Sequence, residues 1–375
     1  MKSALKNVWL VILSAGIVQT ANGLETDILG VRAGLEGFSA FALGIIMASY
    51  YVGYSSGPLA SHSIVARLGH GASIVLFTLI AALVIVLHGL EVTVVAWAVM
   101  RLVSGFALAI VFIGYESWIN ARTENRVRGR VFSLYLVAQM SGMTVAQVLL
   151  NIGDPKALTL FALSAAIFVI GVAPIFFARG KVPAKAPPVP FNIPALMRLS
   201  PMGAAATVLS GVSWAIIFTF GPVYAQRAGF SIAEISVYMG VAMVGGALLQ
   251  FPLGWLSDVI GRRATILFMS LGGVAASLLG IAFHAEPALY QYLPFALMGA
   301  LVLPLYGLAA AHTNDFVRPE TRIAAAAGLV LLFGLGSIAG PLLVGSAIAS
   351  LGSSGFFIVL AGVMGLSVAA TALPR

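Results

Sequence analysis

The chain has 375 residues, of which 60% are hydrophobic and only 9% are charged, and its mean hydropathy is +1.04. Soluble domains carry about a quarter charged residues, so this composition excludes a soluble protein and predicts an integral protein of the lipid bilayer. The absence of cysteine excludes a disulfide framework, a thiolate metal site and a cysteine nucleophile. The net charge of +8 does not require a nucleic-acid partner, because its location along the chain explains it.

Twelve apolar segments are each long enough to cross about 30 Å of hydrocarbon as a helix. The first six are residues 7–29, 38–60, 70–90, 92–119, 131–152 and 156–178. The second six are residues 201–224, 232–256, 264–284, 288–311, 323–350 and 354–373. The basic start Met1–Lys6 precedes a full-length apolar run without a clear cleavage signal, so we interpret that run as the first span.

The lysines and arginines lie mainly on one side of these spans. With a cytoplasmic N-terminus, sixteen of the twenty fall on cytoplasmic loops and ends. Arg32, Lys156 and Arg227 fall outside, and Arg101 falls within a span. Because basic loops are retained in the cytoplasm, this asymmetry predicts that both termini are cytoplasmic.

One proline-rich, basic segment, residues 179–200, interrupts the apolar pattern. Such a segment cannot join a packed helix, so it predicts an extended cytoplasmic linker. The linker divides the chain into an N-terminal six-helix bundle at 1–178 and a C-terminal six-helix bundle at 201–375.

The two halves share residues at nearly constant offsets. An offset of 194 residues places Asn120 on Asn314, Arg128 on Arg322 and Gly142 on Gly336, and an offset of 192 places Gly69 on Gly261. These coincidences predict a parallel repeat of two six-helix halves.

The stretch Gln250–Arg263, with the sequence QFPLGWLSDVIGRR, joins two spans through a short charged loop. Asp258 can accept hydrogen bonds from free backbone N–H groups at a neighbouring helix start, or it can pair with an arginine. The pattern of Gly254, Leu256, Asp258, Gly261, Arg262 and Arg263 resembles the loop signature of the major facilitator superfamily of secondary transporters.

The resemblance extends over nearly the whole chain. Arg101 followed by Gly105 resembles the family's fourth-helix motif, and the run Glu116–Asn120 resembles an uncharacterised compact bacterial branch. The resemblance implies an all-α membrane protein with twelve transmembrane helices in two pseudo-symmetric halves. It further implies a monomer of the bacterial inner membrane that moves a small-molecule substrate by alternating access.

Two features depart from the family pattern. The first-half copy of the loop, residues 57–70, contains no acidic residue. Either a loop latch that uses Asp258 has no symmetric partner, or that half relies on Glu116 with Arg67. The predicted fifth helix also lacks the Gly-Pro signature of antiporter branches, which appears instead as Gly340-Pro341 in the eleventh. This second departure disfavours drug efflux.

Arg101 is the sharpest candidate for a functional residue. With a fourth span that starts near Val92, Arg101 lies about 13 Å deep and close to the midplane. An arginine at that depth needs a wet cavity or a partner, so it predicts binding of an anionic substrate or control of a nearby acid. The alternative is a structural arginine held by backbone carbonyls or one carboxylate.

Acidic residues near the same spans are the candidate partners. If Glu25 reaches Arg101, the pair can exchange its salt bridge for a proton or a substrate. For Asp27 we favour interfacial capping with Arg32. Glu116 falls at the cytoplasmic interface, where a gate or loop ion pair with Arg67, Arg122 or Arg128 is expected.

Further candidates for the substrate site are polar and aromatic residues at similar depth. They are Gln19 and Asn22 in the first span, Tyr50 and Tyr54 in the second, Gln139 in the fifth, Trp214 in the seventh and Tyr238 in the eighth. All five histidines fall near span ends, which argues against a buried histidine relay. Met239 and Met243 share one helix face and keep copper transport open as an alternative, although methionine is ordinary packing.

These observations predict a secondary active transporter for a small polar or anionic organic solute, with protons as the coupling ion. The chain has no nucleotide-binding phosphate loop, no cofactor is expected, and no convergent set of catalytic groups suggests an enzyme. The alternatives are a proton-driven efflux pump for amphipathic compounds, a copper transporter and a non-transporting membrane sensor.

Overall fold

The computed structural model describes residues 2–123, 127–178, 193–318 and 321–374, and within these ranges the regular structure is helical, with no strand. The first half contains α1 (Lys2–Leu35), α2 (Ala40–Leu68), α3 (His70–Leu90), α4 (Val94–Arg122), α5 (Arg128–Leu149), the short 3₁₀ helix η1 (Leu150–Ile152) and α6 (Leu158–Phe177). The second half contains α7 (Ile193–Leu199), α8 (Pro201–Arg227), α9 (Ile232–Ile260), α10 (Arg262–Phe283), α11 (Ala288–Val302), α12 (Leu305–Asn314), α13 (Arg322–Leu351) and α14 (Gly355–Ala370).

The helices agree with the twelve predicted spans. Within the described ranges, ten segments are long and apolar enough to cross a membrane, with α11 and α12 forming a single segment, Ala288–Asn314. Helix α2 falls outside this group because tyrosine, serine and glycine residues in its middle lower its hydropathy, and α14 does so because it has only 16 residues. Together these segments account for each predicted span and confirm the all-α fold.

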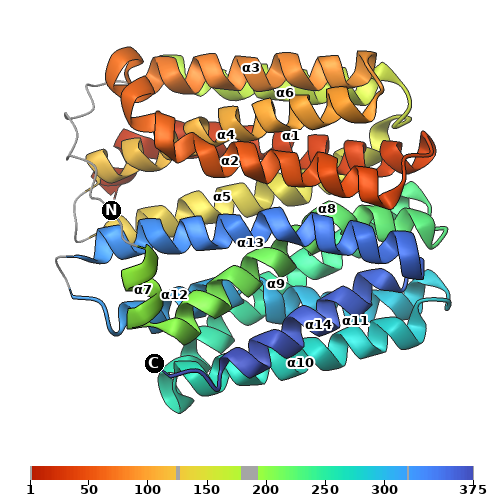
Figure 1. Ribbon diagram of the computed structural model, residues 1–375. Helices are drawn as coiled ribbons and strands as arrows, with labels where there is room; N and C mark the ends of the chain where they lie inside the picture. The colour runs from red at the N-terminus through yellow and green to blue at the C-terminus, as the bar shows by residue number, and fades with distance from the viewer. Residues whose placement is uncertain (1, 124–126, 179–192, 319–320, 375) are drawn as a thin grey trace. The chain divides into compact units, whose positions relative to one another are not determined.

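Contacts divide the chain into two compact units. The N-terminal unit holds Met1–Leu35 and Ser49–Pro188, and in it α1 packs along α5 and α6 while α3 packs along α4 and α6 (Figure 1). The C-terminal unit holds Glu36–Ala48 and Val189–Arg375, and in it α8 packs along α13, α9 along α11 and α10 along α14 (Figure 1).

Glycines at repeat-related positions set the closest helix contacts in each unit. A Cβ atom on Gly142 of α5 would clash with the Gly16 carbonyl of α1, and a Cβ atom on Gly336 of α13 would clash with the Val208 carbonyl of α8. These pairs are separated by the offsets seen in the sequence, 192 and 194 residues. The same close approach of backbones therefore occurs twice.

A second pair of contacts repeats in the same way. Gly53 of α2 and Gly105 of α4 lie against each other's helix backbone, as do Gly245 of α9 and Gly299 of α11. Small residues let membrane helices approach closely. The matching positions give physical support to the pseudo-symmetry predicted from the sequence.

The loops that follow α2 and α9 share one backbone conformation. Gly69 has φ 82° and ψ 162°, and Gly261 has φ 91° and ψ 151°. This positive-φ region strongly favours glycine, and each residue precedes the first turn of the next helix. The offset of 192 residues between them thus marks a repeated turn.

The predicted linker differs from the structure at its C-terminal end. Residues 179–192 lie outside the described residues, but Ile193–Leu199 forms the short helix α7 and not an extended chain. Pro194 occupies the first turn, where proline is tolerated because its missing N–H has no helical partner. Leu196 packs into an apolar cluster with Ala204, Leu329 and neighbouring residues, which anchors α7 to the C-terminal unit.

Candidate functional site

Three of the predicted polar residues line one face of α1. Gln19, Asn22 and Glu25 recur every three residues, a spacing that stacks side chains on one side of a helix. Asn22 Nδ2 donates to Gln19 Oε1 at 3.5 Å, and the Tyr50 hydroxyl of α2 donates to Asn22 Oδ1 at 3.4 Å. The structure thus brings the α1 and α2 candidates together in the N-terminal unit.

Arg101 of α4 completes this group. Its Nη1 lies 3.3 Å from Glu25 Oε1, with 1% of the arginine and none of the glutamate side chain exposed. The guanidinium carbon lies 4.4 Å from the centre of the Tyr50 ring, a cation–π contact, and Nη2 donates to Thr26 Oγ1 at 3.4 Å. Glu25 therefore reaches Arg101, as the sequence suggested.

The local sequence explains how these side chains meet. Gly105 lies one helical turn after Arg101, and its missing side chain lets α4 contact the backbone of α2 at the Tyr50 carbonyl. In the same way, the missing side chain of Gly53 on α2 leaves room for the Leu102 carbonyl of α4. With the two backbones in contact, the Tyr50 ring lies against the guanidinium of Arg101. We name Gln19, Asn22, Glu25, Tyr50 and Arg101 the charged cluster.

The charged cluster lies closer to one end of α4 than predicted. The helix begins at Val94, so Arg101 is seven residues, about 10 Å, from the start of the helix. The estimate of about 13 Å assumed a span that starts near Val92. The cluster therefore lies in the part of α4 that is nearer to its connection with α3.

His88 is a residue that the sequence reasoning missed. Its side chain is fully buried, its Nδ1 bonds with the Val84 carbonyl at 2.9 Å, and the same nitrogen lies 4.0 Å from Glu25 Oε1. The argument that histidines near span ends stay clear of the site is wrong for this residue. The signal was present, because the Glu25 carboxyl also lies toward the outer end of its helix.

Asp27 does not serve as an interfacial cap. Its side chain is only 2% exposed, and Oδ2 accepts a hydrogen bond from Gln147 Nε2 of α5 at 2.6 Å. Arg32 lies with its guanidinium carbon 5.1 Å from the centre of the Phe161 ring. The interfacial interpretation of Asp27 is therefore wrong, and the residue belongs to the contact between α1 and α5.

The remaining candidates fall in different places. Tyr54 stacks on Tyr50 at 5.9 Å between ring centres, next to the charged cluster, and Gln139 is half-buried on α5. Trp214 and Tyr238 belong to the C-terminal unit. Trp214 contacts Phe218 and Phe333, with ring centres 4.6 and 6.3 Å away.

Tyr238 lies in an aromatic cluster of the C-terminal unit. Its ring stacks on Phe295 at 3.8 Å and lies 5.9 Å from Tyr224, and its buried hydroxyl has no hydrogen-bond partner among the described residues. Met239 fills the space above Gly221 with its sulfur, so the structure supports a packing role for this methionine. We name Tyr224, Tyr238, Phe295 and their ring neighbours the aromatic cluster.

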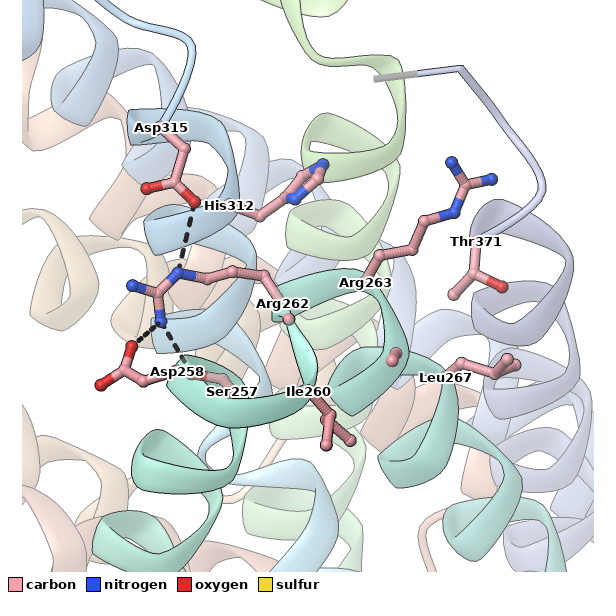
Figure 2. Close-up of a pocket in the computed structure, with 11 residues that line it drawn as sticks. Ser257, Asp258, Ile260, Arg262, Arg263, Leu267, His312, Asp315 and Thr371 are labelled. Atoms are coloured by element: carbon pink, nitrogen blue, oxygen red, sulfur yellow. Dashed lines mark hydrogen bonds and ion pairs between the residues drawn. The ribbon is translucent and has the colours of Figure 1, made fainter.

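The loop between α9 and α10 forms a local charge network around Arg262. Arg262 Nη1 lies 3.1 Å from Asp258 Oδ1 and donates to Ser257 Oγ at 2.7 Å, and Nε donates to Asp315 Oδ2 at 3.3 Å (Figure 2). Of the two partners considered for Asp258, the structure selects the arginine. Arg263 extends away from these groups toward Thr371 (Figure 2).

This network borders an open pocket of about 740 Å³. The glycines of the motif differ in their surroundings. Gly261 has the positive φ angle at the turn, and a Cβ atom on Gly254 would meet no atom within 4 Å.

The corresponding loop of the N-terminal unit has no comparable charge network among the residues described there. Instead, His70 Nε2 bonds with Ser117 Oγ at 2.8 Å.

Glu116 has a hydrogen-bond partner that the sequence did not suggest. Its Oε1 accepts a hydrogen bond from the Tyr135 hydroxyl of α5 at 3.4 Å, and Arg67 is exposed. Among the described side chains, no ion pair joins Glu116 to Arg67. The side chain of Arg128 lies outside the described residues.

The apolar spans, the duplicated helix contacts and the buried charges define a multi-pass protein of the membrane. A family model described as Major Facilitator Superfamily matches residues 203–375. The chain is similar to the uncharacterised MFS-type transporter YcaD of Escherichia coli O139:H28, with 24% identity over 369 residues that cover 97% of this chain and 94% of the relative. YcaD of Shigella flexneri serotype 5b is 25% identical over 347 residues, which cover 91% of this chain and 88% of that relative.

Solved structures support the same fold. A mutant form of the nucleoside transporter NupG aligns with a TM-score of 0.84 and 14% identity over 97% of this chain and 98% of NupG. A bacterial homologue of the human lysosomal transporter Spinster, inward-facing and occupied, aligns with a TM-score of 0.75 and 15% identity over 96% and 95% of the two chains. The C-terminal half of the chain thus matches the model of the major facilitator superfamily, and nearly the whole chain is similar to uncharacterised transporters of that type and shares their fold.

Proposed function

We propose that this chain is a proton-coupled secondary transporter of a small organic anion. In this proposal Arg101 binds the anionic group of the solute and Glu25 binds the coupled proton. The observation that carries the proposal is the buried ion pair between these two side chains, 3.3 Å apart.

The exchange follows from the cost of burying charge. An arginine and a carboxylate together are tolerated in a low-dielectric interior, but a single unpaired charge there is strongly unfavourable. When a solute carboxylate or phosphate replaces Glu25 at Arg101, the released Glu25 carboxylate is left without its cation. A proton on Glu25 removes that charge, so each anion enters the site together with one proton.

The neighbouring polar groups supply recognition. Gln19 and Asn22 offer amide donors and acceptors, and Tyr50 covers one face of the guanidinium. These groups also suit an uncharged polar solute, and NupG, which shares the fold, is a nucleoside transporter. The Arg101 charge favours an anion over a neutral solute, because buried cations are stable only with a counter-charge.

Thermal unfolding of the purified chain against a ligand panel tests this proposal. The panel contains mono- and dicarboxylates, sugar phosphates, nucleosides and lipophilic cations, each measured at two pH values. A bound solute raises the unfolding midpoint with concentration. We expect stabilisation by an anion, and a larger effect at the lower pH because binding takes up a proton.

Variants of the ion pair give the decisive comparison. Because Arg101→Gln alone leaves Glu25 unpaired, the double variant Arg101→Gln with Glu25→Gln removes both charges and keeps the pocket neutral. We expect it to fold and to lose stabilisation by the anion. Glu25→Gln alone should retain anion stabilisation and lose its pH dependence. Anion stabilisation that persists in the double variant would disprove the proposal.

Efflux of amphipathic compounds is a second candidate, favoured by the neutral aromatic surroundings of Trp214 and Tyr238 in the C-terminal unit. It predicts stabilisation by lipophilic cations that does not change in the double variant. The same panel therefore distinguishes the two functions.

We further propose that the chain lies in the bacterial inner membrane, with both termini and the segment 179–200 in the cytoplasm and with halves at 1–178 and 201–375. The support is the distribution of lysine and arginine along the chain. Because the chain contains no cysteine, single cysteines introduced near Lys2, Lys156 and Arg263 can be labelled from one side of the membrane. Labelling of Lys156→Cys alone by an impermeant reagent added outside is the expected result.

A further inference from the structure

Asp27 is a second buried carboxyl on α1, and the proposed exchange at Glu25 does not use it. The two residues are two positions apart, so they point to opposite sides of the helix, roughly 200° apart. Glu25 faces Arg101 of α4, and Asp27 faces Gln147 of α5. Side-chain exposure is 2% for Asp27 and 4% for Gln147.

The charges around Asp27 differ from those around Glu25. Among the described side chains, Asp27 has no ion-pair partner, and its hydrogen bond from Gln147 comes from a neutral amide. On α1 itself the neighbouring charges are Glu25, which is paired with Arg101, and Arg32, whose guanidinium lies over Phe161.

The elements that pack against α1 add no cation beside Asp27 within the described part of the chain. Helix α6 and η1 contain no charged residue, and the charged residues of α5, Arg128 and Arg130, lie at the opposite end of that helix from Gln147. On α4, Arg101 pairs with Glu25. In the connection between α5 and α6, Asp154 and Lys156 are exposed.

An ionised carboxylate in such surroundings is costly, because burial removes its hydration and no cation replaces it. Addition of a proton from water to one carboxylate oxygen forms a neutral carboxylic acid and removes the charge. The resulting hydroxyl is a hydrogen-bond donor that needs an acceptor in the same contact.

Gln147 provides that acceptor. Its Oε1 is buried and has no hydrogen-bond partner among the described residues, whereas its Nε2 contacts Asp27. Rotation of the amide by about 180° exchanges the two atoms with little change in shape and places Oε1 toward the carboxyl. The separation of 2.6 Å is within the range of an O–H···O hydrogen bond and shorter than most N–H···O bonds.

We propose that Asp27 is a second proton-binding site, occupied without solute and held by Gln147 at the contact between α1 and α5. The site extends the proposed function, in which Glu25 binds its proton only together with the anion. Its ligand is a proton from water, and its occupancy is independent of the Arg101–Glu25 pair.

Infrared spectroscopy of the purified full-length chain tests this site without any solute. A protonated carboxylic acid has a carbonyl stretching band separate from that of a carboxylate, and its frequency depends on hydrogen bonding. At neutral pH we expect such a band in the native chain, with the contribution of one carboxyl lost in Asp27→Asn. Glu25→Gln should not reduce this band, because in the proposed function Glu25 takes up its proton only together with the anion.

Two further variants complete the design. Glu116→Gln is the matched control, since it removes another buried carboxyl that accepts a hydrogen bond from a neutral donor, the Tyr135 hydroxyl, and should leave the Asp27 contribution unchanged. Gln147→Leu should shift the frequency of the Asp27 band, a readout that remains if Asp27→Asn does not fold. Equal bands in the native chain and Asp27→Asn, or no shift in Gln147→Leu, would overturn the proposal.

The infrared experiment and the ligand panel test the proton site and the substrate class independently. Loss of the Asp27 band with no anion stabilisation would disprove the proposed substrate class and leave the proton site intact. Anion stabilisation that depends on Arg101, with no Asp27 band, would do the reverse.

Discussion

The two units use the same helix contacts but hold different interiors. Glycine pairs join α2 to α4 and α9 to α11 at offsets of 192 and 194 residues. The same offsets take Glu25 to Ile217, Asp27 to Thr219 and Arg101 to Phe295. The N-terminal unit therefore holds a charged cluster where the C-terminal unit has apolar or hydroxyl side chains.

This difference shows that the glycine contacts between helices and the buried side chains can vary independently in this fold. The glycines are retained in both units, because without them the backbones cannot approach. Among the described residues, the buried acids and arginines occur in the N-terminal unit, where each buried charge must find a partner or be neutralised. Thr219 in the other unit needs only its own helix, since its hydroxyl donates to the Ala215 carbonyl at 2.6 Å.

The largest expected effect comes from breaking the ion pair alone. Arg101→Ala leaves Glu25 buried without its cation, and removal of one partner of a buried pair costs about 3–5 kcal/mol. Phe295→Leu at the repeat-related position removes some volume and the ring that stacks on Tyr238 but leaves no charge unpaired, so it should cost less, about 1–2 kcal/mol. Denaturant unfolding in detergent measures both. Equal losses in the two variants would show that charge does not distinguish the units.

The second-largest effect is expected at the glycine contacts that the two units share. Gly105→Ala and Gly299→Ala each place a Cβ against a backbone carbonyl of the neighbouring helix, so each should destabilise its unit by about 1–3 kcal/mol. Gly240→Ala, which faces open space in α9, should instead stabilise the helix by up to about 1 kcal/mol. A clear difference between the first two variants, measured as unfolding midpoints, would contradict the pseudo-symmetric packing.

Replacement of Tyr50 or Tyr238 by phenylalanine should affect the stability of the protein differently. Tyr50→Phe loses the hydrogen bond to Asn22 and should cost about 1 kcal/mol. Tyr238→Phe removes a buried hydroxyl that has no partner among the described residues, so its stability should stay the same or increase. Thermal midpoints of the two variants check the sign, and a loss at Tyr238 would reveal a polar role within the aromatic cluster.

The smallest effect belongs to the loop network. The side chains of Asp258 and Arg262 are 68% and 29% exposed, and exposed ion pairs contribute about 0–1 kcal/mol that salt screens. Asp258→Asn should therefore change the unfolding midpoint little, and less at high salt. A stability loss above that range would assign this loop a structural role. The corresponding loop before His70, which contains no acidic residue, cannot have that role.

The sequence predicted the spans because hydropathy and helix length are local properties of the chain. It identified Glu25 as a candidate partner for Arg101 because buried charges require partners. The contact between Asp27 and Gln147 was not predictable in this way, since an amide carries no charge and the residues are 120 positions apart. His88 was missed because distance from a span end does not reveal which side chains converge there. Helix α7 was missed because proline content alone does not show that Pro194 falls in a first turn.

The opposite directions of Glu25 and Asp27 on α1 bear on the electrical character of transport. One anion that moves with one proton carries no net charge, so the membrane voltage does no work on that cycle. A second proton released from Asp27 on one side of the membrane in each cycle would add one positive charge, on which roughly 100 mV does about 2.3 kcal/mol of work. That energy corresponds to a roughly fifty-fold concentration ratio of solute across the membrane. A proton that stays on Asp27 through the whole cycle adds no charge, so release from Asp27 would separate electroneutral from electrogenic transport.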